Sequence, residues 1–246
     1  MEGRIPSVSV IIPTLNEASR IGTLIESLQA QTFRPLEIIV SDGPSTDGTA
    51  DAARQYEGVQ VVSAERGVSN GRNAGAAMAR GEWLYFVDAD VSLAPDFIAS
   101  CQVELKRRRL DAACPHYWPN GSTWIIKLLH HGYNLLFWSM QKLVPSGGGS
   151  CIIVRREVFR RSAGFRAPPF EDMEFLRQVG SLGSKHRFGF ISPVIGVSDR
   201  RFRSDGALRT ALLYALVSPL FVLGLYGLAR RVPYRFGHHQ PADSVR

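Results

Sequence analysis

Residues 83–90 read WLYFVDAD, and this stretch decides the fold that we expect. Its first five residues are all apolar, which is typical of a strand buried on both faces of a sheet. Two carboxylates, Asp88 and Asp90, follow the strand directly. In α/β sheets ligands bind beyond the carboxyl ends of the strands, so we expect this acidic pair to lie at a binding site.

Three further apolar runs precede this strand and alternate with helical patterns. The predicted strands are residues 8–12, 36–40 and 59–62. The predicted helices are residues 21–28, residues 50–54 with Asp47 as N-cap, and residues 70–79. The first helix has apolar positions at i, i+3, i+4 and i+7, and the third is Ala-rich and stops near Gly81. This alternation predicts an α/β fold with a mainly parallel sheet flanked by helices.

Carboxylates recur where these strands end. Asp42 directly follows the second strand, as Asp88 and Asp90 follow the fourth. Two carboxylates around one residue suit Mg²⁺ or Mn²⁺, because these hard cations take oxygen ligands and leave positions for a substrate phosphate. Asp42 could accept the N–H of a nucleobase edge. Each residue alone is also compatible with a solvated turn, but the set of three favours a ligand site.

The net charge of +7 belongs to one part of the chain. Residues 1–146 carry 13 basic and 15 acidic side chains, whereas residues 147–246 carry 16 and 7. A nucleic-acid partner is therefore disfavoured, since the basic excess is not spread over the chain or interleaved with exposed aromatics. A local site for a diphosphate or an anionic lipid is favoured instead.

The remaining composition narrows the class of protein. A chain of 246 residues with 45% hydrophobic side chains is neither disordered nor a small disulfide scaffold. Three scattered cysteines without CxxC spacing indicate reduced thiols in a cytoplasmic protein, and zinc is not expected. The first residues show no long apolar run, so we predict no secretory signal.

Two apolar segments lie in the second half of the chain. Residues 122–144 (STWIIKLLHHGYNLLFWSMQKLV) carry Trp and Lys side chains typical of interfacial anchoring. Residues 210–229 hold no charge, are flanked by arginines and approach the length that crosses a bilayer. We expect a membrane-associated protein at the inner face of the cell membrane, with core or oligomer-interface helices as the alternative. Between these segments we predict a strand over residues 151–154, a basic helix over 155–161 and another helix opening near 168–172.

Several motifs in the same order resemble those of the family-2 nucleotide-sugar glycosyltransferases. They are residues 8–17 (VSVIIPTLNE), 41–49 (SDGPSTDGT), 71–81 (GRNAGAAMARG) and 86–90 (FVDAD), extended by 147–165 (GGGSCIIVRREVFRRSAGF) and 170–176 (FEDMEFL). The resemblance covers roughly residues 7–209. It implies a GT-A fold, a UDP- or GDP-sugar donor and Mn²⁺ or Mg²⁺ as cofactor. We accordingly expect a catalytic domain over residues 1–206, with donor half 1–95 and acceptor half 96–206, and a membrane-associating element over 207–246.

The resemblance also implies roles for individual residues. In the donor pocket, Pro13, Leu15 and Glu17 would line the space for the nucleoside, and Asp42 would bind the base. Arg72 would lie near the base and the phosphates, Asp88 would contact the ribose or the metal, and Asp90 would bind the metal. Asp172 would be the general base. Arg200 and Arg201 resemble a basic element near the diphosphate, with a basic collar beside a membrane as the alternative. An inverting transfer needs such a base at the acceptor hydroxyl and positive charge on the departing diphosphate.

The chain departs from the family pattern at two points. Pro44 stands where many relatives have a small flexible residue, and the Gln-x-x-Arg-Trp motif of processive synthases is absent from the sequence. We therefore predict transfer of a single sugar to a lipidic or amphiphilic acceptor. Two alternatives stay open: a polyprenyl-phosphate sugar synthase, in which Asp172 only positions the acceptor, and a nucleotide-sugar-binding module without catalysis.

Overall fold

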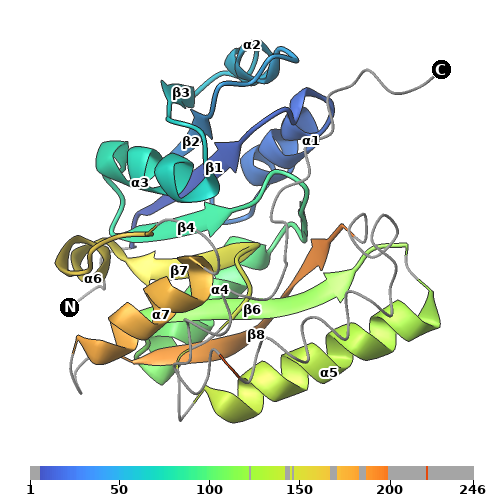
Figure 1. The fold of residues 1–246 in the computed structure, drawn as a ribbon, viewed down its shortest axis with the longest axis vertical. Coiled ribbons are helices and arrows are strands. Elements are labelled where there is room, and N and C mark those ends of the chain that lie inside the picture. The colour runs from blue at the N-terminus through green and yellow to red at the C-terminus, as the bar shows by residue number, and fades with distance from the viewer. Residues whose placement is uncertain are drawn as a thin grey trace.

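The computed structural model describes residues 6–121, 123–141, 145, 147–166, 171–182, 187–198 and 220, which build an eight-stranded sheet flanked by helices (Figure 1). The strands follow the order β3-β2-β1-β4-β7-β6-β8-β5. Their bounds are β1 Val8–Thr14, β2 Glu37–Asp42, β3 Val59–Ser63, β4 Trp83–Val87, β5 Ser92–Leu93, β6 Ala112–Pro119, β7 Cys151–Arg155 and β8 Phe188–Val197. The helices are α1 Ala18–Gln29, α2 Thr49–Arg54, α3 Val68–Met78, α4 Phe97–Arg108, α5 Trp124–Met140, α6 Arg156–Arg161 and α7 Glu171–Ser181.

The first half of the sheet is parallel, as the sequence predicts. β1 lies between β2 and β4, with Ile11 opposite both Ile39 and Phe86, and all three side chains are fully buried. Helix α3 packs so closely on β1 that a Cβ on Gly75 would collide with Ile11. Because β1, β2 and β4 run parallel, their polar carboxyl ends lie at one edge of the sheet.

The second half of the sheet contains antiparallel strands that the sequence pattern did not predict. β7 runs antiparallel to both of its neighbours, β4 and β6, and β5 runs antiparallel to β8. The N–H of Asp88 donates to the carbonyl of Ser150 (3.1 Å) just beyond the β4–β7 ladder. The reversal of β7 therefore places the loop before it beside the acidic end of β4.

Two details of the predicted elements are settled by the described residues. The sequence predicts Asp47 as the N-cap of α2, and this prediction is wrong. The N-cap is Gly48, which has a left-handed backbone conformation. Asp47 still serves the first turn from one residue further out, because its Oδ1 accepts the N–H of Thr49 (3.0 Å). The three cysteines are free and buried, as expected of reduced thiols.

The predicted apolar segment 122–144 contains helix α5, which lies along β6 and β8 at one end of the molecule (Figure 1). Among the described residues, no helix has the length and apolar character needed to cross a membrane. The predicted segment 210–229 lies outside the described residues apart from Leu220, as do Arg200 and Arg201.

Candidate active site

The carboxyl ends of β1 and β2 meet at a fixed carboxylate. Thr14 and Asp42 are register partners, and the Thr14 hydroxyl donates to Asp42 Oδ1 (2.8 Å). The Ser45 hydroxyl donates to the same oxygen (2.7 Å). Asp42 is 8% exposed. These two bonds hold the carboxyl group in one orientation at the strand end, where the sequence predicts a base-binding residue.

The loops after β1 and β2 interlock through backbone groups. Asn16 has a φ of 56°, and its Oδ1 accepts the N–H of Thr46 (2.9 Å) while its own N–H donates to Ser45 Oγ (2.9 Å). The N–H of Glu17 donates to Thr49 Oγ1 (2.9 Å). Asn16 thus has a left-handed backbone conformation and is bonded to the second loop through both its N–H and its side chain, so these hydrogen bonds fix the shape of the loop. The predicted nucleoside pocket is therefore bounded by a stiff wall.

The three residues predicted to line that pocket differ in their surroundings. Pro13 and Leu15 are partly exposed at the end of β1. Glu17 is buried, and its carboxylate forms an ion pair with Arg20 on α1 (2.9 Å). Pro13 and Leu15 thus offer apolar surface beside Asp42, whereas the Glu17 carboxylate is held toward the helix that follows it.

Arg72 is the centre of a second group of predicted residues. Its side chain is 2% exposed. Nη2 contacts Asp88 Oδ1 (3.2 Å) at the end of β4 and donates to the carbonyl of Gly149 (2.8 Å), while Nη1 contacts Glu171 Oε1 (3.3 Å) at the start of α7. Burial alone would lower the pKa of Arg72, but the neighbouring carboxylates raise it, so the guanidinium stays charged.

The guanidinium of Arg72 also lies over an aromatic ring, with its carbon 5.0 Å from the centre of Phe165. Two buried polar atoms in this group have no hydrogen-bond partner within the described part of the chain: Arg72 Nε and Glu171 Oε2. Unpaired buried polar atoms are costly, and they recur where a ligand completes a site. The fold thus joins α3, in the predicted donor half, to α7, in the predicted acceptor half.

Asp172 is a carboxylate that ionises near neutral pH. Burial raises its pKa to about 7, with Glu171 adding to the rise and Arg72 opposing it. Its Oδ1 accepts the N–H of Met173 (2.8 Å). A Cβ on Gly149 would lie 3.1 Å from Asp172 Oδ2 and 3.0 Å from Arg72 Nη2. The glycine therefore lets the backbone approach the proposed base and the guanidinium together.

Asp88 and Asp90 stand at the end of β4, where a divalent cation is expected. Burial raises the pKa of Asp88 to about 6, although Arg72 lowers it and Asp90 raises it further. The Asp88 side chain keeps 31% of its surface exposed while its Oδ1 contacts Arg72, so part of the carboxylate stays accessible. This oxygen-only pair fits a hard cation that takes its other ligands from phosphate and water. The described residues contain no group of three or more His, Cys, Asp or Glu side chains able to hold a metal.

The structure brings together most of the residues that the sequence singles out, and it adds others. Asp42 lies with Pro13 and Leu15 on one side, while Arg72, Asp88 and Asp172 share the other. Gly149, Phe165 and Glu171 had no assigned role at the sequence level. The GGG run and the Glu-Asp pair were the only signals that could have found Gly149 and Glu171.

This architecture is shared by solved glycosyltransferase structures. A mannosyltransferase from Pyrobaculum calidifontis, determined with GDP-Man and Mn²⁺, has a TM-score of 0.67 and 25% identity over 87% of this chain and 63% of its own. Glucosyl-3-phosphoglycerate synthase from Mycobacterium tuberculosis, determined with Mn²⁺ and UDP, has a TM-score of 0.64 and 20% identity over 89% and 80%. The predicted GT-A fold is confirmed by this likeness.

The sequence defines the family as well as the fold. The model of the family described as Glycosyl transferase family 2 matches residues 9–163, and the chain belongs to this family. It is 30% identical over 148 residues to an Escherichia coli chondroitin synthase, covering 58% of this chain and 21% of that enzyme. It is 37% identical over 94 residues to a Mycobacterium bovis PGL/p-HBAD biosynthesis glycosyltransferase, covering 36% and 37%. The chain thus spans only a fraction of the length of these curated relatives.

Proposed function

We propose that this glycosyltransferase moves one sugar, with inversion, from a UDP- or GDP-sugar to the hydroxyl of a lipidic or amphiphilic acceptor at the cytoplasmic face of a membrane. The observation that carries the proposal is the arrangement around Arg72. One guanidinium links the carboxylate that follows β4 with the start of α7, where Asp172 has a pKa of about 7. A base is most effective when its pKa lies near the working pH.

The donor would bind at the edge formed by β1, β2 and β4. Pro13 and Leu15 present apolar surface to the nucleoside, and Asp42 accepts an N–H of the base while its Oδ1 is held by Thr14. The relative from Pyrobaculum calidifontis, with its bound GDP-Man and Mn²⁺, supports a nucleotide-sugar donor and a divalent metal. The loops after β1 and β2, which would form one wall of the donor pocket, are already held by hydrogen bonds. Fewer groups therefore have to be ordered when the donor binds, and the entropic cost of binding is lower.

Asp88 and Asp90 would hold Mn²⁺ or Mg²⁺, and the bound cation would neutralise charge on the departing diphosphate. Arg72 contacts Asp88 from the buried side of this site and fixes the orientation of its carboxylate. Arg200 and Arg201 remain proposed diphosphate contacts, since arginine offers bidentate, permanent charge to phosphate. The protein's part is thus to hold two carboxylates around the cation that the diphosphate would contact.

Asp172 would accept the proton of the acceptor hydroxyl as the bond to the sugar forms. Desolvation keeps this carboxylate basic, and Gly149 leaves the space in front of it unobstructed by a side chain. A phosphate acceptor is already ionised and needs no base, whereas a hydroxyl must lose its proton as the new bond forms. A carboxylate whose pKa is about 7 is suited to that proton transfer, and this favours a hydroxyl acceptor over the polyprenyl-phosphate alternative.

Thermal unfolding with a panel of nucleoside-diphosphate sugars, with and without Mn²⁺, tests the donor assignment. A ligand raises the unfolding temperature by an amount set by its concentration relative to Kd. We expect a UDP- or GDP-sugar to raise the midpoint in the presence of Mn²⁺, and Asp90→Asn to remove the metal-dependent part. If no nucleotide shifts the midpoint, the donor pocket is wrongly assigned. If nucleotide binds but no sugar is ever transferred, the chain is a binding module.

A further inference from the structure

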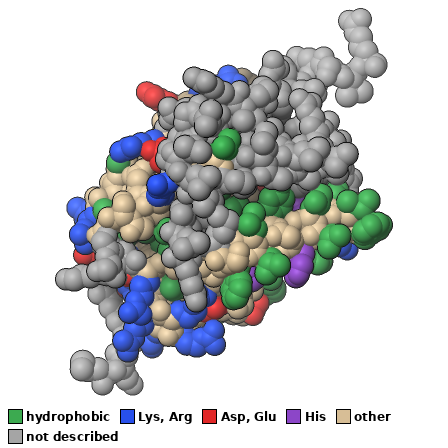
Figure 2. Space-filling view, turned by 60° about the horizontal axis from the view of Figure 1, so that its bottom comes forward, with side chains coloured by type: hydrophobic (Ala, Val, Ile, Leu, Met, Phe, Trp, Pro, Cys, Tyr) green, Lys and Arg blue, Asp and Glu red, His purple; other side chains and the backbone are tan. Residues whose placement is uncertain are grey.

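Helix α5 presents an apolar face to solvent. Its exposed large side chains are Trp124, Ile125, Leu128, Leu135, Leu136 and Trp138, with exposed fractions between 37% and 72%. Figure 2 shows hydrophobic side chains in green patches along the helix, interrupted by histidine (purple) and by other atoms (tan). Two further exposed residues, Trp118 on β6 and Val194 on β8, are 43% and 48% exposed. An apolar face of this extent marks a surface that contacts something other than water.

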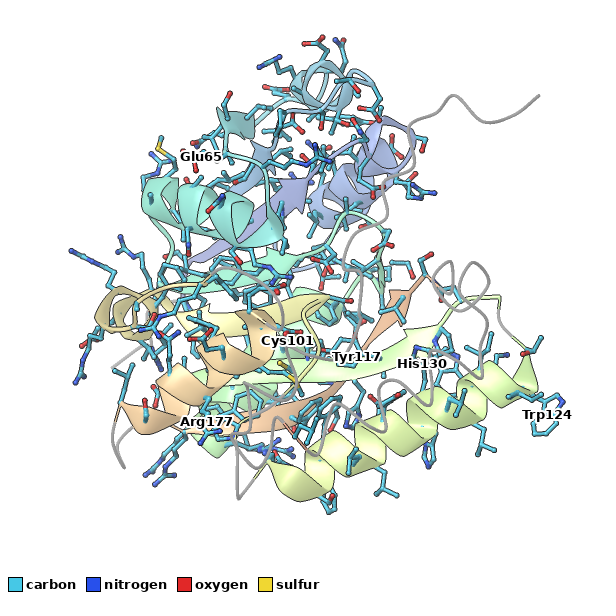
Figure 3. The ribbon with its side chains drawn as sticks, in the orientation of Figure 1. Glu65, Cys101, Tyr117, Trp124, His130 and Arg177 are labelled. Carbon is cyan, nitrogen blue, oxygen red and sulfur yellow. The ribbon has the colours of Figure 1, made fainter. Side chains whose placement is uncertain are left out.

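Polar side chains of α5 face the sheet beside the buried Ile126 and the partly buried Phe137. Asn134 faces the sheet, where its Oδ1 accepts the N–H of Tyr117 (3.1 Å) and its Nδ2 donates to the Tyr117 carbonyl (2.8 Å). Gln141 accepts the N–H of Phe190 (2.8 Å). Figure 3 shows His130 directed toward the sheet and Trp124 projecting from the end of the helix. Hydrogen bonds therefore fix this helix with its apolar side outward.

Trp118 and Val194 leave the same face of the sheet that α5 covers. His116 stacks on Phe190 (5.9 Å between ring centres), and Phe190 stacks on Phe137 of α5 (6.0 Å). Trp118 lies two residues beyond His116 on β6, and Val194 is the register partner of His116 on β8. Since alternate residues of a strand share a face, both extend the apolar surface beside α5.

We propose that α5, with Trp118 and Val194 beside it, docks this protein onto an anionic lipid bilayer, the helix lying in the plane of the interface. Tryptophans stand near both ends of α5, as in helices that sit at the headgroup level. Lys127 is its one Lys or Arg, and the helix contains no Asp or Glu. A hydrophobic stripe without acidic side chains suits a bilayer whose surface is negative.

Basic side chains border one end of this docking face. Arg108, at the end of α4, hydrogen-bonds the carbonyl of Phe190, whose N–H is bonded to Gln141 at the end of α5. Next to Arg108, Lys106 and Arg109 are exposed. Anionic headgroups attract such residues when they approach the membrane. The positive charge at this border therefore complements the negative surface of the bilayer that the apolar face of α5 would enter.

A second copy of the chain is a weaker occupant. A coiled-coil pairing through Leu128 and Leu135 would require charged side chains on the flanking positions to set partner and orientation. Those positions carry Gly132 and Ser139 on one side. On the other side they carry Lys127 and Asn134, and Asn134 is already bonded to β6. The described residues of α5 thus offer a single charged side chain, Lys127, on the flanks of such a pair.

The docking face is connected to the active site by a short chain of contacts. Asn134 holds the backbone of Tyr117, and the Tyr117 hydroxyl donates to the carbonyl of Gly148 (2.6 Å). The next residue, Gly149, contacts Arg72. These contacts link α5 through β6 to the loop before β7. A role of the docking face in presenting an acceptor to the site rests on the proposed function.

Quenching of tryptophan fluorescence by brominated lipid tests the insertion of α5 in the full chain. The protein contains four tryptophans, of which Trp83 is buried. We expect vesicles of brominated phosphatidylcholine and phosphatidylglycerol to quench the wild type, and Trp124→Phe with Trp138→Phe to remove most of the quenching. Equal quenching in the wild type and this variant, or none in the wild type, overturns the proposal even if another segment binds the vesicles.

Sedimentation with the same vesicles supplies the energetic test. Leu128→Gln with Leu135→Gln should lower the partition coefficient by about tenfold or more, as expected when two buried leucines are lost. Val103→Gln, which alters an equally exposed residue on α4, should leave partition unchanged. If the leucine variant instead converts a dimer to a monomer without vesicles, a second copy occupies the face and the proposal is wrong.

The two proposals fail separately. Transfer to a detergent-dispersed acceptor should survive the leucine substitutions, because neither leucine touches the site. Vesicle binding by α5 without transfer from any nucleotide sugar would refute the proposed function and leave the docking face intact. Transfer that proceeds equally well on vesicles with the wild type and the leucine variant would refute the docking face alone.

Discussion

Replacing Asp172 by Asn tests whether this carboxylate is both desolvated and catalytic. Burial raises the pKa of Asp172 from 3.8 to about 7, so the folded protein holds this proton more tightly than the unfolded chain does. The free energy of unfolding therefore falls as the pH rises through the interval from about 4 to about 7. Above pH 7 the penalty is fully present, and an uncharged residue at this position should relieve it.

The magnitude follows from the size of the shift. About three pKa units correspond to about 4 kcal/mol, at roughly 1.4 kcal/mol per unit. Asp172 is only partly buried, and its bond from the N–H of Met173 remains possible for Asn. Because solvent screens part of the interaction, we expect Asp172→Asn to raise the free energy of unfolding by about 2 kcal/mol at pH 8 and about 0.5 kcal/mol at pH 4.5.

Urea unfolding followed by circular dichroism at the two pH values measures this difference. Glu174→Gln is the matched control, because Glu174 lies in the same first turn of α7 but forms an ion pair with Arg166 (3.1 Å). The control should gain no stability at pH 8. A gain for Asp172→Asn that is equal at both pH values, or a loss at pH 8, would refute the desolvation argument.

The same variant should lose activity while it gains stability. Removing a general base costs about 10²- to 10⁴-fold in rate, and the wild-type kcat/KM should rise with pH along a limb centred near 7. A variant that keeps the wild-type kcat/KM would show that Asp172 is not the base. Stability and activity thus test burial and catalysis at one side chain by independent measurements.

Three further substitutions probe the geometry of the fold and site. Gly149→Ala places a methyl group 3.0 Å from Arg72 Nη2. In a transfer assay kcat should fall at least about tenfold, because a small misplacement of catalytic groups is costly. A variant with the wild-type kcat would contradict the close approach of Gly149 to Arg72. Gly75→Ala drives a methyl group into Ile11 and should lower the free energy of unfolding in urea by about 1–3 kcal/mol; an unchanged midpoint would contradict the packing of α3. Asp42→Asn should weaken the binding of a nucleoside diphosphate about tenfold or more, because a charge-assisted hydrogen bond is lost. Calorimetry measures the Kd, and an unchanged Kd would show that Asp42 does not bind the base.

The first four strands could be predicted because each contains a short apolar run. All five residues of β4 are buried, and so are all six of β2, whereas β3 is only partly buried. Neither β6 nor α4 gave such a signal. β6 contains Pro115 and His116, and α4 buries Gln102 and Glu104 on its inner face, so polar residues obscure both patterns. Tertiary packing overrode local propensity in each case.

The candidate site was only partly visible in the sequence for a related reason. The acidic pair after β4 and the Glu-Asp pair of α7 are local motifs, and the sequence shows them directly. The partners of Arg72 lie 77 residues away at Gly149 and 99 residues away at Glu171. No periodicity within α3 indicates that its arginine points inward. Only the pairing of β7 with β4, which follows from the whole sheet, brings these residues within reach.

The position of Arg72 links the end of β4 to the loop before β7 and to the start of α7. Its Nη2 holds both Asp88 and the backbone of Gly149, so a displacement of the loop before β7 changes the geometry at the end of β4 as well. Its Nη1 holds Glu171, the neighbour of the proposed base. A lysine could not replace this arginine, because a single ammonium cannot span three acceptors with a planar fork. The sheet therefore supplies the position, and one buried cation couples both halves of the proposed reaction.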